Sequence, residues 1–240
     1  MNLCDDSELG YLASRTRFAA GESLVLDENY RLAHLPLVAP AHPKVIARRE
    51  GKSYDMGRHE RVTSLVLPVP GAAFRASPAA QQLEAEFRAS PFAEKIAWHV
   101  LPQRQDRLHA TLCSTPTIAV AARESLARLG PITVELRGLF SGNVNVGRLY
   151  LRAYPEKRDG RNVVHHLQAM LACRRTDLYV VGLYNLADDL DAGETAALMR
   201  LIDRWWDRPL LRFRADVLWL LSSADDLVLD ANVVEAIPLQ

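Results

Sequence analysis

The second half of this chain repeats the order of elements found in its first half. From His109 onward, the pattern of apolar residues predicts a strand, a helix, a strand, a turn and a strand, and the same order begins again near Gly182. A proline, Pro131 or Pro209, precedes the second strand of each set. A repeated unit of this kind predicts an α+β fold of two similar lobes, with antiparallel sheets and outer helices around a shared central groove.

The individual elements follow from apolar periodicity and from Pro and Gly stops. Strands are predicted over 63–70, 95–102, 108–113, 132–140, 146–154, 177–186, 210–222 and 225–234. Helices are predicted over 78–89, 119–129, 163–172 and 192–207. Residues 61–240 therefore form the predicted bilobal domain.

Residues 1–60 have a different character. They hold a proline-punctuated stretch, 32–44, and a strongly charged run, 48–61, and their apolar periodicity is weak. The short apolar pieces 23–26 and 35–38 are each compatible with an edge strand or a hairpin arm. We expect this region to be an N-terminal extension that packs on the main domain.

Charge and composition exclude several function classes. The 240 residues carry 29 Lys and Arg against 29 Asp and Glu, which argues against a general polyanion binder but leaves room for a small phosphate ligand. Hydrophobic residues make up 49% of the chain, as expected for a globular protein and not for a disordered one. The longest uncharged stretch, 108–122, is too short and too polar to span a membrane, and the N-terminus is acidic. A cytoplasmic protein without a membrane partner is expected.

No cofactor or metal is indicated. The chain has no P-loop, no G-x-G-x-x-G after a strand, no G-x-S-x-G and no H-E-x-x-H. Its three cysteines, Cys4, Cys113 and Cys173, lack metal-ligand spacing and do not suggest a disulfide framework. The acidic cluster 188–191 could suggest a metal, but it also suits the start of the helix that follows, where carboxylates cap free N–H groups. We favour the cap.

The run LHATLC contains the main chemical candidate. Because side chains alternate along a strand, His109 and Thr111 point to one face, and Ala110 and Leu112 to the other. An imidazole can transfer a proton near neutral pH, and a hydroxyl can donate a hydrogen bond to a phosphate oxygen. The alternative is a histidine and a threonine that merely face solvent.

This arrangement resembles the 2H phosphoesterase superfamily, the LigT-like fold of RNA 2′,5′-ligases and cyclic phosphodiesterases. In that family each of two lobes contributes a strand with a hydrophobic–His–x–Thr/Ser–hydrophobic motif. The resemblance covers about residues 60–240, and the stretch IAWHVLPQRQDRLHATLC is similar to the run-in to the first motif. It implies that His109 is an acid/base histidine and that Thr111 anchors phosphate.

The second motif departs from the family pattern. Its place is taken by GLYN, so that Gly182 stands at the histidine position and Tyr184 at the threonine position, and no histidine follows His166. Tyr184 could donate a hydrogen bond to phosphate or stack on a base. Arg148 and Arg214 are candidates for a basic rim of the groove, because the planar guanidinium of arginine can donate two hydrogen bonds to a phosphate. The alternative for them is a solvated sheet face.

Two functions follow from these observations. The first is a phosphodiesterase, a phosphoric diester hydrolase, that acts on 2′,3′-cyclic or 2′,5′-linked nucleotide or RNA-end phosphates, with His109 in acid/base catalysis. The second is a catalytically degenerate member that binds a nucleotide or a protein partner without turnover. The loss of one of two proton-transfer groups, each contributing about 10²–10⁴ in rate, is the reason for the second. A replacement group could come from His99 or from the histidines of the extension, His34, His42 and His59.

Overall fold

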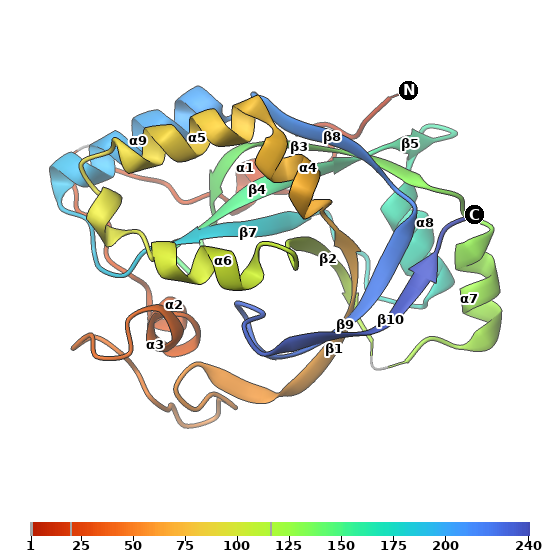
Figure 1. Cartoon of the computed structure of the whole chain (residues 1–240), viewed down its shortest axis with the longest axis horizontal. Helices are drawn as coiled ribbons and strands as arrows, with labels where there is room; N and C mark the ends of the chain where they lie inside the picture. Colours follow the sequence, from red (N-terminus) through yellow and green to blue (C-terminus); the bar gives the residue numbers. More distant parts are fainter. Residues whose placement is uncertain (1, 20, 116) are drawn as a thin grey trace.

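A single curled antiparallel sheet of eight strands forms the centre of the computed structural model, which describes residues 2–19, 21–115 and 117–240. Its strand order is β10-β9-β1-β2-β7-β4-β3-β8 (Figure 1). The strands are β1 (Arg58–Pro68), β2 (His109–Ser114), β3 (Ile132–Ser141), β4 (Arg148–Pro155), β7 (Val180–Asn185), β8 (Pro209–Ala215), β9 (Val217–Asp225) and β10 (Ala231–Pro238). A separate small hairpin joins β5 (Lys157–Arg158) to β6 (Arg161–Asn162).

The two strands that open the sequence repeat lie next to each other in the sheet. Strand β2 pairs with β7 through Ala110 and Val181. The rest of the sheet differs from the prediction of two separate sheets. Strands β3 and β4 lie on the β7 side together with β8, whereas β9 and β10 lie on the far side, beyond β1. One continuous sheet therefore mixes strands from both halves of the sequence.

The curl of the sheet is required by the connection between β8 and β9. Only Asp216 separates these strands, yet β8 pairs with β3 at one edge and β9 pairs with β1 near the other edge. The sheet must bend for one residue to bridge these places, and Figure 1 shows the blue ribbon passing from one side to the other. The single strand predicted over 210–222 is therefore two strands.

The helices cover the outer side of this sheet. Helix α9 (Ala192–Trp205) packs on β3, α5 (Pro78–Arg88) on β8, α7 (Val120–Ala127) on β10 and α8 (Val163–Met170) on β2. These four helices are the predicted ones. The shorter helices are α1 (Tyr11–Ser14), α2 (Glu28–Ala33), α3 (Leu35–Val38), α4 (Gly71–Ala76), α6 (Leu101–Arg104) and the 3₁₀ turns η1 (Ala93–Lys95) and η2 (Trp98–Val100).

Of the acidic cluster before α9, Asp191 is confirmed as the helix cap, whereas Asp188 contacts His42 and Asp189 contacts Leu26 and Lys44. The Asp191 carboxylate accepts a hydrogen bond from the Glu194 backbone N–H at 2.8 Å, and the Glu194 side chain accepts one from the Asp191 N–H at 2.8 Å. This reciprocal capping box satisfies two N–H groups that a helix start leaves free.

Two predicted strands are helical instead. Residues 95–102 run from the end of η1 through η2 into α6, with Ile96 and Ala97 between the two 3₁₀ turns, and Ile96, Ala97 and Val100 are buried. Apolar residues at 96, 98 and 100 fit an alternating strand, but the buried set fits a helical spacing, and the two periods cannot be told apart over so short a run. Residues 35–38 form α3, whose Pro36 lies in the first turn, where proline is tolerated.

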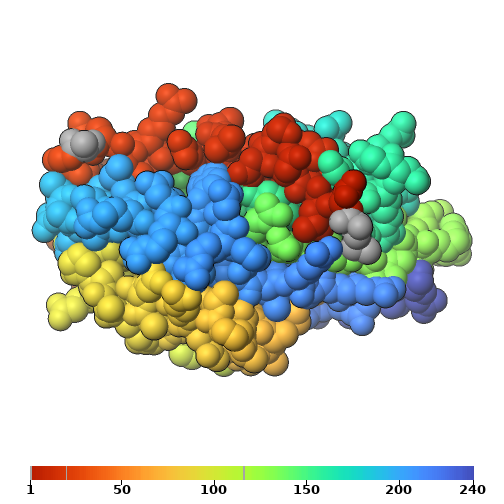
Figure 2. Space-filling model, turned by 90° about the horizontal axis from the view of Figure 1, so that it is seen from above, coloured from red at the N-terminus to blue at the C-terminus, as the bar shows by residue number. Residues whose placement is uncertain are grey.

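The N-terminal residues pack on the same core as the rest of the chain. Tyr11 and Tyr30 are fully buried, and Leu24 forms an isolated β-bridge with Leu190. In Figure 2 the red N-terminal segment runs along one side of the molecule, beside α9 and the green strands. The division of the chain at residue 60 stays a prediction.

Among the described residues, no helix is long and apolar enough to cross a membrane.

Candidate functional site

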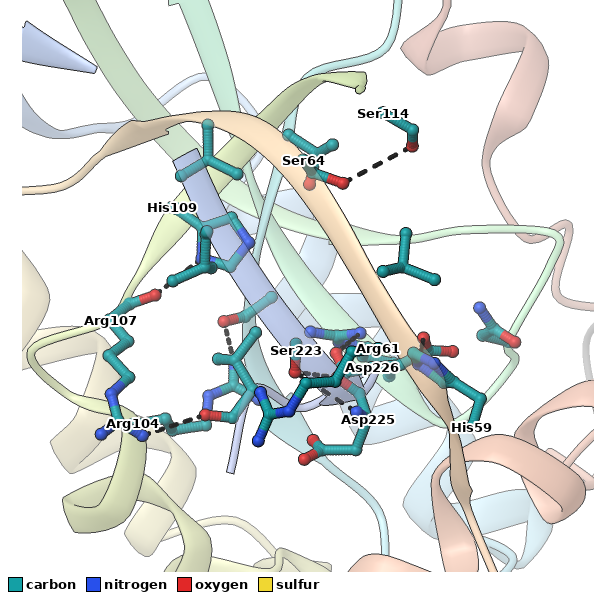
Figure 3. A pocket seen from close by; sticks show the side chains of 18 of the residues that line it. His59, Arg61, Ser64, Arg104, Arg107, His109, Ser114, Ser223, Asp225 and Asp226 are labelled. Carbon is teal, nitrogen blue, oxygen red and sulfur yellow. Dashed lines mark hydrogen bonds and ion pairs between the residues drawn. The ribbon is translucent and has the colours of Figure 1, made fainter. Parts of the chain in front are cut away.

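A cavity of about 610 Å³ lies against the inner face of the sheet, where β2 and β7 meet. Its walls come from β1, β2, β4, β7, β9 and the residues just before β1. Figure 3 shows this cleft from close by, with His109, Arg107 and Arg104 along one side and His59 and Asp226 along the other. The cleft is thus built from segments far apart in the sequence.

Strand β2 presents the first motif to this cleft. His109 and Thr111 both line it, whereas Ala110 and Leu112 are 1% and 2% exposed on the opposite face. The alternation predicted for LHATLC is therefore confirmed, and the imidazole and the hydroxyl stand side by side on the same wall.

His109 is held as a neutral imidazole of one tautomer. Its Nδ1 lies 2.7 Å from the backbone carbonyl oxygen of Arg107, which can only accept, so Nδ1 carries the proton. Burial lowers the pKa of His109 to about 4. The hydrogen bond to Arg107 opposes this shift, and the positive charges of Arg148 and Arg104 add to it. Nε2 is then the nitrogen with a free lone pair, and within the described residues it has no hydrogen-bond partner.

Strand β7 brings Gly182 to the cleft opposite this motif, and an arginine fills the space above it. A Cβ atom added at residue 182 would lie closer than 3.0 Å to the Nε, Cζ and Nη2 atoms of Arg148. The guanidinium from β4 therefore rests on Gly182, at the position where the resemblance would place a second histidine. Any side chain at 182 would displace it.

Three contacts fix the Arg148 guanidinium. Nη1 donates to the backbone carbonyl of Asp226 at 2.9 Å and lies 3.1 Å from Nε2 of His34. The Nε, Cζ and Nη2 atoms pack against the backbone of Gly182. Nε is buried and has no hydrogen-bond partner. Among the described residues, no carboxylate contacts this arginine or forms an ion pair with it.

Arg104, from α6, is the second cation of the cleft and, unlike Arg148, is fully buried. Its side chain is 2% exposed, Nη2 donates to the carbonyl of Gly182, and Nη1 lies 3.5 Å from Oδ1 of Asn185. Burial, and next the charge of Arg148, lower the pKa of Arg104 to about 9. Its Nε also lacks a partner, and no described carboxylate lies within ion-pairing distance.

A buried carboxylate also lines the cleft, but it forms no ion pair with either arginine. Asp225 is 2% exposed, and its two oxygens accept hydrogen bonds from the backbone N–H groups of Leu227, Leu229 and Asp230 at 2.7–3.0 Å. It stabilises the turn between β9 and β10. Among the described residues, neither the buried Arg104 nor the half-buried Arg148 has a carboxylate in direct contact, and a buried cation without a counter-ion is costly unless an anion binds.

The opposite wall of the cleft is acidic and aromatic. His59 lies 3.3 Å from Oδ1 of Asp226 through Nε2, and 2.6 Å from the carbonyl of Glu60 through Nδ1. The Tyr54 hydroxyl donates to Oδ2 of Asp226 at 2.9 Å, and its ring meets the His59 ring edge-on. Both ring nitrogens of His59 face oxygen acceptors, so both already have partners within the protein.

Histidines of the N-terminal extension do approach the site. His59 lines the cleft, and His34, which is fully buried and stacked on Tyr30, contacts Arg148. Burial and the two arginines lower the pKa of His34 well below its usual range. His34 is therefore neutral at pH 7 and acts as an acceptor toward Arg148. His42 pairs with Asp188 instead, and the exposed His99 does not line the cleft.

Two predicted site residues lie elsewhere. Tyr184 is 3% exposed and packs on Phe87, with ring centroids 4.3 Å apart, and against Trp98. The register between β4 and β7 shifts at this point, so the strict alternation that would place Tyr184 on the side of Gly182 is broken. Arg214 is exposed on the edge strand β8 and borders a different cavity.

Arg104 is a site residue that the sequence pattern did not indicate, and His34 has a role that the pattern did not suggest. Arg104 stands between the strands predicted over 95–102 and 108–113, and His34 stands in an extension of weak periodicity. The one available signal was proximity, because Arg104 precedes His109 by little more than one helical turn. No cluster of three or more His, Cys, Asp or Glu side chains that could hold a metal occurs among the residues that the structure describes.

No family model and no curated protein matches this chain. Among solved structures, the crystal structure of TT0787 of Thermus thermophilus is similar, with 12% sequence identity, a TM-score of 0.38 and an alignment that covers 74% of this chain and 97% of that chain.

Proposed function

We propose that this protein binds the phosphate of a nucleotide or of an RNA end in the cleft on the inner face of the sheet, where β2 and β7 meet. The observation that carries the proposal is the pair of arginines, Arg104 buried and Arg148 half-buried, that line the cleft with His109 and have no carboxylate partner in the described chain. Guanidinium groups of this kind are the preferred donors to phosphate oxygens.

The remaining residues of the cleft suit the same ligand. The Thr111 hydroxyl can donate to a non-bridging phosphate oxygen, as the resemblance to the 2H phosphoesterases implies. A bound phosphate also favours the protonated form of His109, because a nearby anion stabilises the imidazolium. The cleft volume of about 610 Å³ falls within the range of small-molecule sites.

The geometry favours binding of the phosphate over cleavage of its ester bond. Cleavage by the two-histidine route needs one group that accepts a proton and another that donates one. At the second position this chain has Gly182 covered by Arg148, and a guanidinium stays protonated at all accessible pH values. It can neutralise charge there but cannot protonate a leaving oxygen.

Hydrolysis of a 2′,3′-cyclic or 2′,5′-linked phosphate is the second candidate. It is favoured by the tautomer of His109, whose free Nε2 can accept a proton from an attacking water. The water oxygen would bond to phosphorus, the bond from phosphorus to one ribose oxygen would break, and that oxygen would take its proton from solvent. A phosphodiesterase of this kind would be slow.

The two-lobe architecture of the 2H phosphoesterases belongs to the same proposal. The four strands β10, β9, β1 and β2 would form one lobe, and β7, β4, β3 and β8 the other. The junction between them is the short pairing of β2 with β7.

A panel of 2′,3′-cyclic nucleotides, 2′,5′-linked dinucleotides and nucleoside 2′- and 3′-phosphates tests the function. Wild type is expected to bind at least one member by calorimetry, to release no product, and to lose affinity about tenfold or more in His109→Ala. Turnover that His109→Ala abolishes would establish the phosphodiesterase instead. Failure of wild type to bind any member would overturn the assignment of a phosphate site.

A further inference from the structure

We propose that a second pocket, on the outer side of the sheet, binds a small uncharged aromatic molecule that carries one hydrogen-bond acceptor. The pocket has a volume of about 310 Å³ and lies between α4, α5, α6 and β7. In Figure 1, α6 runs beside β7, below α4 and α5. Leu183 borders this pocket, whereas its neighbour Gly182 borders the cleft, and Arg104 and Leu108 stand between the two cavities. The pocket is therefore a separate site behind the cleft.

The Tyr184 hydroxyl indicates that this pocket takes a ligand. Tyr184 is 3% exposed, and its hydroxyl has no hydrogen-bond partner among the described residues, although buried tyrosines usually have one. The residue borders the pocket together with Glu84 and Arg88. Burial, and next the charge of Glu84, raise the pKa of this hydroxyl, so it stays protonated at neutral pH and can donate. An acceptor on a ligand would satisfy a donor that is costly to leave unpaired.

The rest of the wall is largely apolar and aromatic. The Trp98 ring meets the Tyr184 ring edge-on, with centroids 5.6 Å apart. Its indole N–H already donates to the carbonyl of Ala93 at 2.8 Å, so Trp98 offers the pocket aromatic surface and not a donor. Further apolar side chains come from Phe74, Leu101, Pro102, Leu108 and Leu183. Apolar walls with few polar groups are typical of small-molecule pockets, and a volume near the lower end of their range of about 300–1,000 Å³ suits one or two aromatic rings.

The charged side chains at the pocket already have partners. Arg88 pairs with Glu84 at 2.7 Å, and Arg75 pairs with Asp106 at 2.9 Å. The third arginine, Arg104, contacts β7 through both Nη groups, and its Nε is buried. An anionic or cationic ligand would therefore have to compete with existing contacts, whereas an uncharged one would not.

A titration with quinoline tests the proposal without any nucleotide, so its outcome is independent of the proposed function. Quinoline is an uncharged two-ring compound at pH 7 with one acceptor nitrogen. Heteronuclear NMR follows the indole N–H signal of Trp98, assigned by its loss in Trp98→Phe. In wild type this signal is expected to shift and to saturate with a Kd of about 1 mM or below. Tyr184→Phe removes the donor and keeps the ring, so it should weaken binding about three- to tenfold.

Two further variants separate this pocket from nonspecific binding. Leu101→Trp fills the pocket and should weaken binding about tenfold or more. Leu12→Trp changes an exposed leucine of α1 that does not border the pocket, and it should keep the wild-type affinity. A thermal melt confirms that each variant is folded, and if Leu101→Trp does not fold, Tyr184→Phe decides.

Quinoline-4-carboxylate, an anion of similar shape, should bind more weakly than quinoline. An unmoved Trp98 signal in wild type would overturn the proposal, as would undiminished binding in Leu101→Trp. Equal affinity in Tyr184→Phe would remove the hydroxyl as the anchor, and tighter binding of the carboxylate would remove the preference for an uncharged ligand. Either result contradicts the site as proposed.

Discussion

At the scale of single residues, Gly182 decides which cation occupies the cleft. The absence of a side chain at this position lets the Arg148 guanidinium rest on the backbone of β7. The departure from the family motif was visible in the sequence, but its consequence was not. Only the structure brings Arg148, from another strand, over the vacant position, because β4 and β7 are neighbours in the sheet.

Gly182→Ala is therefore expected to lower the affinity for adenosine 3′-phosphate about tenfold, because the new methyl group displaces Arg148. Calorimetry measures the affinity, and a thermal melt checks the fold. Gly10→Ala is the matched control, since a Cβ there would meet its nearest atoms at ordinary distances of 3.6 and 3.8 Å. Unchanged affinity in Gly182→Ala would show that Arg148 does not bind the ligand.

At the scale of elements, the long periodic segments were predictable and the short ones were not. The helices α5, α7, α8 and α9 agree with their apolar spacing, as do the strands β2, β3 and β4. The segment that leads into Arg104 was predicted as a strand and is helical. The break between β8 and β9 at Asp216 leaves no sequence signal, because an apolar alternation continues through it.

The register shift between β4 and β7 leads to a prediction for Tyr184. Because its ring packs on Phe87 and its hydroxyl makes no hydrogen bond in the described chain, Tyr184→Phe should change the free energy of unfolding by less than about 1 kcal/mol. Tyr184→Ala should lower that free energy by about 3 kcal/mol, because it leaves a cavity in the core. Urea unfolding measures both.

Nucleotide affinity of the folded Tyr184→Phe variant should equal that of wild type. A loss of affinity about tenfold or greater on removal of the hydroxyl would return Tyr184 to the role that the sequence pattern suggested, a hydrogen-bond donor to phosphate.

At the scale of the whole molecule, the site depends on contacts that no local pattern encodes. His109 and Thr111 were predictable, since a strand period and a motif suffice to place them on one face. Arg148 and His34 were also named as candidates, but they meet each other, beside Arg104, only because the sheet curls and the N-terminal residues pack beside it. Residues this far apart in the chain are brought together by topology, which composition and periodicity do not specify.

The same assembly makes His109 a reporter of the ligand. Burial and the charges of Arg148 and Arg104 hold its pKa at about 4, and an anion bound between these groups should raise it by at least about one unit. The exposed His99, which does not border the cleft, serves as an internal reference in the same protein.

The most direct test is a pH titration of the histidine ring protons by NMR, with and without adenosine 3′-phosphate, with the His109 signal assigned by its loss in His109→Gln. We predict that the ligand raises the pKa of His109 by about one unit or more and does not move the ring signals of His99, which lies outside the cleft. A His109 pKa that does not move at saturating ligand would contradict the account of this cleft as a phosphate site.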